Sequence, residues 1–488
     1  MIKPTLGHLA RCRIALCVCA VPLATFAADQ HDSAQEPELA KNSSQYFAGS
    51  EHDADQAKEF WDNVADRKYL FGDWFGVRDD LAANGISVTL SFVTNLAGNP
   101  VGGMSRGFTE TDSTGLNVAV DFGTLAGLDG LTGFVSTAYR QGTSLAQRRI
   151  GSAVSVQQVY GGQTFHLVNL YLAQTLFDNH LHLKAGRIAQ FDDFSHDFAF
   201  GYYMNNGFDG QPVGFFFQGP FTAYPVTTWG AIAKWGMPLD EDQGVYAFAG
   251  VYGADTEVGD NRYHGTDFSF DFNRGANVMV EVGYKRNWGM KAVAEGALAT
   301  KAAIGGWWFT GDFPVNSLNQ NRPATKEGIG GFYYLLHQGL YREKHPVETP
   351  PESQLEGGET YWGQTDVLRT VEQGLFVFAT GQFAGASTSQ FDVFVNFGAY
   401  YRGLLPGRDE DVLALGYYHG YFSDELFASQ VANNAPPQSY EAALELGYRC
   451  NITDYFYVQP NIQYVMNPGG TGRIDDALVL GAQIEVDF

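Results

Sequence analysis

Histidines and carboxylates are the residues in this sequence best suited to acid–base or metal chemistry. The chain has 11 histidines and 54 acidic residues, but it contains no His-Glu-x-x-His run and no paired-cysteine metal motif. His180 and His182 would share one face of a strand, yet no carboxylate stands at an obvious third position. The sequence therefore predicts neither an enzyme nor a metal or cofactor site.

Polar side chains instead recur at every second position along most of the chain. In the final stretch, 476–488, one side of an extended strand is mostly aliphatic, and the other side carries Gln483, Glu485 and Asp487. A period of two is the period of a β-strand and not of a helix. The elements that must position the polar groups are therefore strands with two unlike faces.

Three charged residues, Glu281, Glu445 and Arg449, fall on the polar side of such strands. An apolar protein core excludes charges of this kind, whereas a water-filled lumen accepts them. Strands with one face toward lipid and the other toward internal water build a barrel. We therefore predict an all-β fold, a transmembrane antiparallel β-barrel of the outer membrane.

The composition agrees with this fold class. Aromatic residues make up 15% of the 488 residues, and 58 residues are glycine, which suits barrel strands, tight turns and interfacial girdles. Beyond the amino terminus, no segment approaches the roughly 20 apolar residues that a spanning helix needs. The net charge of −24 argues against nucleic acid as a partner.

The amino-terminal region is typical of an exported protein. Residues 1–27 combine a basic start, a short apolar run and a small-residue exit, so we predict a signal peptide. Residues 28–71 are polar and acidic and are predicted to form a periplasmic linker. Cys450 is the only cysteine after the predicted signal, so no internal disulfide is expected.

A short helix over 73–84, with Asp73 as its cap, is predicted to precede a barrel over 86–488. About sixteen strands are expected, a number that leaves an aqueous channel rather than a packed interior. The predicted strands are 86–97, 115–123, 131–140, 163–175, 180–187, 226–236, 244–252, 275–286, 300–311, 328–342, 370–382, 389–401, 410–421, 439–449, 454–465 and 475–488.

The connections between these strands are expected to alternate between short and long. The long connections include 141–162, 188–225, 254–274 and 345–369. Segment 188–225 is rich in Phe, Tyr and Asp and has the composition of a loop that folds. In a pore, such a loop can enter the lumen and narrow it.

Several short runs resemble one family, the carbohydrate-selective porins of the OprB type. They are Gly72-Asp73-Trp74-Phe75-Gly76-Val77-Arg78, Arg140 to Leu145, Lys184 to Arg187, Tyr224-Pro225-Val226, and Asn467-Pro468-Gly469-Gly470. The resemblance spans about 72–488, which we take as the porin domain. It implies passive, carbohydrate-selective diffusion of glucose-like mono- or disaccharides. Many members carry two cysteines in the region of 195–210, but this chain has none there, so packing and hydrogen bonds must hold that loop.

Two criteria suggest pore-lining residues. One is the family resemblance, and the other is strand parity, meaning which of the two faces of a strand a residue occupies. Arg140 shares its parity with polar positions and is predicted to point into the lumen. The family motif suggests Arg187, although its parity is that of the lipid side, so it lines the pore only if the strand bulges there. Asp192 and Asp193 are the nearest candidate carboxylates. Trp229 could stack on a sugar, or it could belong to an interfacial girdle.

The expected partners are sugars as transported solutes, together with outer-membrane lipid and lipopolysaccharide around the barrel. Monomers and homotrimers are both compatible with the sequence. The alternative function is a general, cation-preferring porin, which the acidic balance favours. The two differ in conductance and in block by sugars.

Overall fold

The computed structural model describes residues 64, 67–161, 163–208, 210, 213–240, 242–255, 260–270, 272–288, 290–316, 324–344 and 372–488. The predicted signal peptide 1–27 and almost all of the predicted linker 28–71 lie outside the described residues. The described residues all belong to one compact unit that runs to Phe488.

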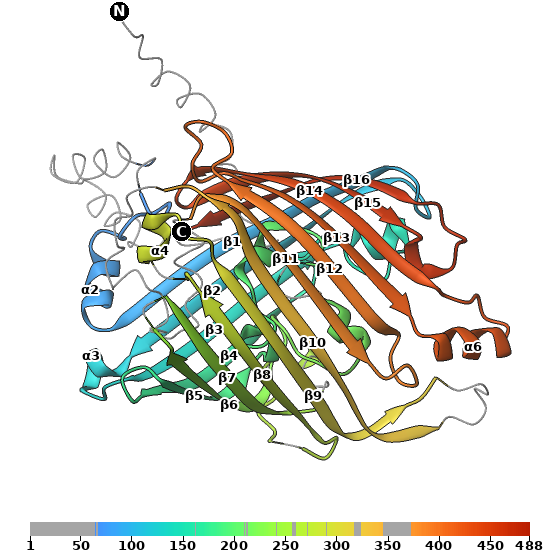
Figure 1. Ribbon diagram of the computed structural model, residues 1–488, viewed down its shortest axis with the longest axis horizontal. Coiled ribbons are helices and arrows are strands. Elements are labelled where there is room, and N and C mark those ends of the chain that lie inside the picture. The colour runs from blue at the N-terminus through green and yellow to red at the C-terminus, as the bar shows by residue number, and fades with distance from the viewer. Residues whose placement is uncertain are drawn as a thin grey trace, which may run out of the picture. The chain divides into compact units, whose positions relative to one another are not determined.

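Sixteen antiparallel strands form a closed barrel in this part of the chain, and each pairs with its neighbours in sequence (Figure 1). The strand β1 closes the ring by pairing with β16. The strands are β1 (Ile86–Val101), β2 (Gly107–Asp121), β3 (Leu131–Gly142), β4 (Thr164–Leu176), β5 (Leu181–Ile188), β6 (Thr228–Pro238), β7 (Gln243–Gly253), β8 (Ala276–Arg286), β9 (Thr300–Pro314), β10 (Thr325–Arg342), β11 (Gly374–Ala384), β12 (Phe391–Arg402), β13 (Val412–Phe422), β14 (Tyr440–Thr453), β15 (Phe456–Met466) and β16 (Ala477–Asp487). The predicted fold class and strand number are confirmed.

Short helices lie between the strands. The α-helices are α2 (Val77–Ala83), α3 (Phe122–Ala126), α4 (Met290–Glu295) and α6 (Asp424–Ala432), and single π or 3-10 turns occur at Ala146–Ile150, Gln190–Asp192, Phe198–Tyr202, Val213–Phe217, Asn261–Tyr263 and Pro468–Gly470. None of the described helices combines the length and the apolar character needed to cross a membrane.

The first helix begins later than predicted. It starts at Val77 rather than near Asp73, because Trp74, Phe75 and Gly76 have φ values of 55°, 61° and 90°. Three consecutive left-handed residues cannot belong to a right-handed helix. Asp73 does not cap the helix through its side chain; its carbonyl accepts the amide of the helix residue Arg78 at 2.9 Å.

The side chain of Arg78 binds the carboxy-terminal residue. Its guanidinium donates to the main-chain oxygen of Phe488 at 2.6 Å, and it lies 3.6 Å from the ring centroid of Tyr69 and 4.4 Å from that of Trp74. Arg78 therefore holds Phe488 next to the place where β1 pairs with β16.

The end of the predicted linker already belongs to the barrel. The amide of Leu70 donates to the carbonyl of Asp487 at 2.8 Å, and the ring of Phe71 lies 5.4 Å from that of Phe488. The boundary predicted at residue 72 is therefore too late, because Leu70 and Phe71 already contact the last residues of the barrel, Asp487 and Phe488.

Side chains alternate between the two faces of the barrel wall as predicted. On the outer face, Leu444, Ile462 and Leu480 are 43–49% exposed. On the inner face, Glu445 and Gln463 are fully buried. An exposed apolar band outside and polar groups inside are typical of a membrane-spanning barrel.

The two ends of the barrel differ. The described chain ends and α2, α3 and α4 gather at one end, the turn end, whereas α6 lies at the other, the loop end (Figure 1). The connection between β10 and β11, 343–373, belongs to the turn end by strand order. The sequence predicted that long connections alternate with short turns, yet the long connection 345–369 lies between two strands that are joined at the turn end. The prediction is therefore wrong at this point. Residues 345–369 themselves lie outside the described part.

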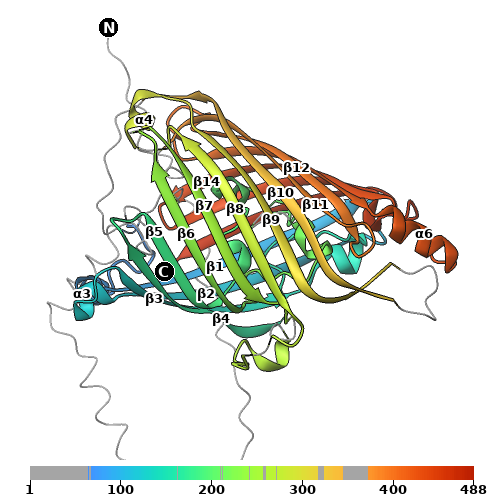
Figure 2. The same cartoon turned by 60° about the horizontal axis from the view of Figure 1, so that its bottom comes forward.

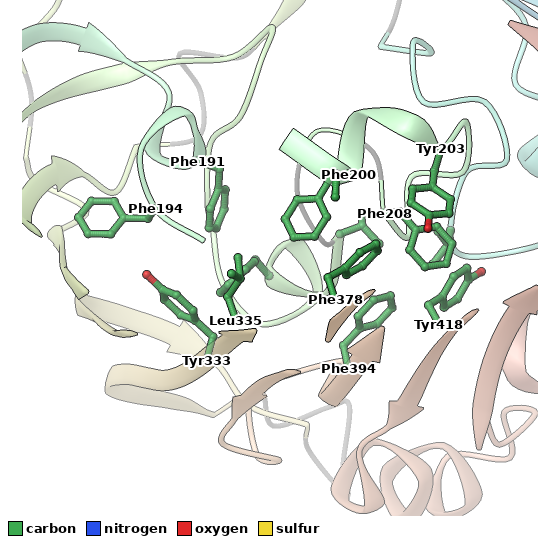
Figure 3. Close-up of a cluster of buried hydrophobic side chains, with 14 of the residues drawn as sticks. Phe191, Phe194, Phe200, Tyr203, Phe208, Tyr333, Leu335, Phe378, Phe394 and Tyr418 are labelled. Carbon is green, nitrogen blue, oxygen red and sulfur yellow. The ribbon is translucent and has the colours of Figure 1, made fainter. Parts of the chain in front are cut away.

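Two loops from the loop end enter the lumen, the β3–β4 loop (143–163) and the β5–β6 loop (189–227). Figure 2 shows the green turns of the β5–β6 loop within the ring of strands. Its buried aromatic side chains face the strands β10–β13 (Figure 3). From the loop come Phe191, Phe194, Phe200, Tyr203 and Phe208, and from the wall come Tyr333, Leu335, Phe378, Phe394 and Tyr418, all at most 3% exposed. On this side the lumen is a packed interior and not the open aqueous channel that was predicted.

Candidate functional site

One half of the barrel wall is covered from inside, and the other half stays accessible from the lumen only toward the turn end. The covered half, β8–β15, has buried lumen-facing side chains, including Met279, Phe309, His337, Phe378, Asn396 and Gln459. The opposite wall, β1–β4, keeps accessible lumen-facing side chains, including Ser87, Thr89, Ser91, Asn117, Phe134 and Tyr171. Accessible lumen-facing side chains therefore gather in the turn-end half of β1–β4, whereas toward the loop end Asn95, Thr111 and Arg140 of the same wall are 0–5% exposed.

Carboxylates of the covered wall hold the backbone of the β5–β6 loop. Glu281 accepts the amide of Ser195 at 2.8 Å and the hydroxyl of Tyr333 at 2.7 Å. Glu445 accepts the amides of Met204 and Asn205 at 2.7 and 3.0 Å. Hydrogen bonds to charged groups are stronger than neutral ones, so these contacts fix where the loop lies.

Arg449 completes this set by donating to the carbonyl of Gly201. The three charges predicted to face the lumen, Glu281, Glu445 and Arg449, do face it, but their predicted contact with water is wrong. They are 0–4% exposed, because the loop supplies the hydrogen bonds that water would otherwise make.

A buried triad of side chains adds a further anchor. Asp197 of the loop lies 2.9 Å from His337 of β10 and 3.4 Å from Lys301 of β9, and it also accepts the amide of Ala199 at 3.1 Å. Burial would raise the pKa of the Asp197 carboxyl, but His337 and Lys301 outweigh burial and hold this pKa below its usual value. The carboxylate therefore stays ionised and keeps its partners.

The β3–β4 loop is held in the same manner and contacts the β5–β6 loop. Glu441 of β14 accepts the amides of Ala153 and Val154 at 2.7 and 2.9 Å. The amide of Gln158 donates to the carbonyl of Met204 at 2.9 Å. The two inner loops therefore form one body that narrows the lumen from the covered side.

Arg140 lies in the uncovered wall, where its parity predicted it. It faces the lumen at 5% exposure, beside Ser113 of β2 in the strand register. Its guanidinium carbon lies 4.9 Å from the ring centroid of Tyr224, at the end of the β5–β6 loop. A hydrogen bond also joins the side chains of Tyr224 and Ser113. Burial raises the pKa of the Tyr224 hydroxyl, the charge of Arg140 lowers this pKa, and the charge of Asp192 raises it. Tyr224 therefore joins the loop to the wall, and the place where Tyr224 meets Arg140 and Ser113 is called the narrow point below.

The two candidate aspartates behave differently. Asp193 is buried and pairs with Lys184, at 2.6 Å, and with Lys234. Burial would raise the pKa of Asp193, but the two lysines outweigh it and hold this pKa below its usual value. Asp192 is exposed, although it lies inside the barrel, and it accepts from Asn169 of β4 at 3.2 Å. Asp193 thus fixes the loop, whereas Asp192 contacts the β4 wall and stays accessible.

The arrangement is therefore a barrel with a fixed inner loop, an accessible wall and opposite charges near Tyr224. The family model for "Carbohydrate-selective porin, OprB family" matches residues 105–488. This chain belongs to the OprB family of carbohydrate-selective porins.

Known proteins similar to this porin agree with the family. Porin B of Pseudomonas aeruginosa is 27% identical over 445 residues, which is 86% of this chain and 91% of that protein. The putative porin QuiX of Acinetobacter baylyi is 24% identical over 88% of this chain and 95% of that protein. The high-pH structure of Pseudomonas putida OprB has the same fold, with a TM-score of 0.75 at 23% identity, covering 87% of this chain and all of that one.

Two of the expected pore-lining residues of this porin are not in the lumen. Arg187 stands opposite Leu170 and Trp229 in the strand register, which places it on the outer side of the wall. It is 1% exposed because the β7–β8 loop (254–275) covers it, and it donates to the carbonyls of Asp267, at 2.5 Å, and Thr227, at 3.1 Å. No bulge turns Arg187 inward, so the pore-lining interpretation is corrected.

Trp229 also lies on the outer side of the porin wall. Its indole donates to the carbonyl of Ser269 at 3.0 Å, and its ring lies 5.7 Å from that of Phe270 in the same β7–β8 loop. The girdle alternative for Trp229 therefore fits its position, and stacking on a sugar inside the lumen does not.

The residues missed from the sequence are Lys184, Lys234, Asn169 and Tyr224. Lys184 could have been found, because it shares the lumen parity of His182 in β5. Tyr224 could not, because nothing local indicates that the end of a long loop returns to Arg140.

The sequence of this porin also contains a run from Gly103 to Gly107 that matches the Gly-x-Ser-x-Gly pattern of serine hydrolases. It lies in the hairpin between β1 and β2, not at a strand-to-helix elbow, and the Ser105 hydroxyl accepts from Arg149 at 3.3 Å. Across the described residues, no group of three or more His, Cys, Asp or Glu side chains is placed to hold a metal ion. The fold and the family indicate a channel rather than an enzyme.

Proposed function

We propose that this porin carries neutral, glucose-like mono- or disaccharides passively along a path between the β5–β6 loop and the wall β1–β4. The observation that carries the proposal is the pair of contacts between the fixed loop and the β1–β4 wall: Arg140 lies 4.9 Å from the ring centroid of Tyr224, and Asp192 accepts from Asn169 at 3.2 Å. The porin family and the barrel fold indicate the outer membrane, where short turns face the periplasm. The turn end is then the exit.

The chemistry of this narrow point suits a sugar. A sugar loses water from its hydroxyl groups when it enters a narrow path, and protein groups must replace that water. The guanidinium of Arg140 offers donors to several hydroxyls, whereas the carboxylate of Asp192 accepts hydroxyl protons. Because the two charges are opposite, a neutral solute meets no net charge there.

The fixed loop makes the narrow point permanent. Each closed barrel encloses its own path, so transport requires no second chain, whether the porin is a monomer or a homotrimer in its membrane. We also propose that residues 1–27 are removed on export, that 28–71 remain as a periplasmic linker up to the contact of Leu70, and that lipid and lipopolysaccharide surround the outer face.

Planar-bilayer recording with a panel of neutral sugars tests the proposal. The expected result is a small single-channel conductance that a mono- or disaccharide blocks reversibly. A large conductance with cation preference, and without block by any sugar, would instead establish the general cation-preferring porin, which the net charge of −24 favours.

A further inference from the structure

The uncovered wall contains a pair of stacked aromatic rings away from the narrow point. Phe134 of β3 and Tyr171 of β4 stand opposite each other in the strand register. Their ring centroids lie 5.2 Å apart, and their planes are 29° from parallel. Both share the lumen parity of their strands, and both are half-buried. Apolar ring surface is thus accessible inside the pore.

The pair is supported from the β5 side. Lys184 lies 4.8 Å from the ring centroid of Tyr171, and Asp193 of the inner loop holds Lys184 at 2.6 Å. Because β4 lies between β3 and β5, Phe134 and Lys184 approach Tyr171 from different sides. The row Phe134–Tyr171–Lys184 is therefore fixed at one end by the loop, and Phe134 forms its other end.

Small and polar side chains surround the Phe134 end of this row. Ala119 of β2 stands directly opposite Phe134, which leaves room above the ring. Asn117 and Thr89, paired with each other on β2 and β1, are both half-buried on the lumen side. An accessible aromatic ring beside amide and hydroxyl groups matches the two surfaces of a pyranose, which has an apolar C–H face and a polar rim.

We propose that Phe134, supported by Tyr171 and Lys184, is a stacking site that holds the pyranose ring after it leaves the narrow point. The inference rests on the proposed sugar transport and adds a second site to it. Phe134 and Arg140 are six positions apart on β3, about 20 Å along the strand, so one monosaccharide cannot occupy both. The site selects for cyclic sugars, because an acyclic polyol has no flat C–H face.

Current-noise analysis of sugar block in Phe134→Leu tests the site. Replacing the ring removes stacking but keeps an apolar side chain, so the dissociation rate of glucose should rise about two- to tenfold. Block by an acyclic polyol, sorbitol, should not change. Phe134→Tyr should behave like the natural protein.

A matched control lies on the outer face of the same barrel. Phe332 stacks on Phe383 with ring centroids 4.8 Å apart and planes 15° from parallel, and Phe332 is 52% exposed. Phe332→Leu therefore removes a stacked ring that no lumenal sugar reaches, and it should leave glucose block unchanged.

The outcomes separate the site from the transport function. If the natural protein shows no block by any sugar, the transport proposal fails. If glucose blocks the natural protein but Phe134→Leu and the natural protein behave alike, only the stacking site is overturned. An equal loss of glucose and sorbitol block in Phe134→Leu would also overturn the stacking site, because the ring would then affect both solutes through the width of the lumen and not by stacking. If the Phe134→Leu protein fails to fold, Phe134→Tyr and Tyr171→Leu decide. The stacking site requires glucose block to persist in Phe134→Tyr and to weaken in Tyr171→Leu. Lost block in Phe134→Tyr, or unchanged block in Tyr171→Leu, overturns the site.

Discussion

Replacing Asp197 by alanine should release the inner loop from the covered wall. Asp197 is the one carboxylate that joins the described loop residues to both His337 and Lys301, and all three side chains are at most 5% exposed. Alanine removes the negative charge but leaves Lys301 buried beside His337. A buried charge that has lost its partner destabilises the state that buries it.

The magnitude follows from the loss of a buried ion pair. Breaking such a pair costs about 3–5 kcal/mol, and each 1.4 kcal/mol changes an equilibrium tenfold. The ratio of displaced to docked loop should therefore rise by a factor of roughly 100 to 5,000. The barrel ladder is not touched, so the change should appear as loop opening rather than as loss of the barrel.

Single-channel recording is the assay for this loop opening. Asp197→Ala should show frequent, brief steps to a higher conductance, whereas the natural protein should show few. Protease cleavage between 189 and 227 in detergent should accelerate in parallel. A triple variant, Asp197→Leu with Lys301→Met and His337→Phe, removes the ion pair together with the imidazole and should restore a steady current.

Two results would refute the reasoning about Asp197. One is an Asp197→Ala channel whose conductance, noise and cleavage match those of the natural protein. The other is a triple variant as unstable as the single one, because the cost would then come from lost packing and not from an unpaired charge.

Four other perturbations test separate parts of the structure. Arg140→Ala should weaken sugar block about tenfold, since it removes charge-assisted hydrogen bonds; unchanged block, measured by current noise, would remove Arg140 from the narrow point. Arg78→Ala should lower the thermal unfolding midpoint, read from heat-modified gel mobility, by a few degrees, because it frees Phe488; an unchanged midpoint would mean that this contact adds no stability. Although the Asp192 side chain is accessible inside the barrel, the surrounding wall and loop keep bulk water away and raise the pKa of Asp192 to about 6, so its carboxylate is charged above that pH and neutral below it. Cation selectivity, measured as reversal potential, should fall on acidification through pH 6, and a fall that persists in Asp192→Asn would assign it to another group. Deleting most of 192–218 should widen the pore and raise its conductance, and an unchanged conductance would contradict the place of this loop in the lumen.

Strands were predictable from the sequence because the two faces of a barrel strand meet different media at every second residue. The prediction missed the first half of β2, which begins at Gly107 rather than near 115. Its outward side chains there include Glu110 and Asp112, so this part of the strand lacks the apolar face by which the others were recognised. Polar outward residues are expected where a strand rises beyond the hydrocarbon layer.

The pore-lining residues were less predictable because their positions depend on loops. Arg140 lies within a regular strand, so its parity sufficed to place it in the lumen. Arg187 and Trp229 also follow their parity, which is that of the outer face, and only the family resemblance had suggested the lumen. The β7–β8 loop that covers Arg187 and Trp229 comes from a distant part of the sequence, and no pattern near these two residues predicts that contact.

The width of this pore is set by which half of the wall the inner loop covers, and not by the number of strands. Sixteen strands alone enclose a wide water-filled space. Here Glu281 and Glu445 accept loop amides, and aromatic side chains fill the space beside them. Carboxylates that would otherwise attract cations along β8–β15 are thereby satisfied by protein, so the charges left to meet a solute are those near the uncovered wall. A neutral solute can pass such a surface without losing or gaining an ion partner, although the chain as a whole is strongly acidic.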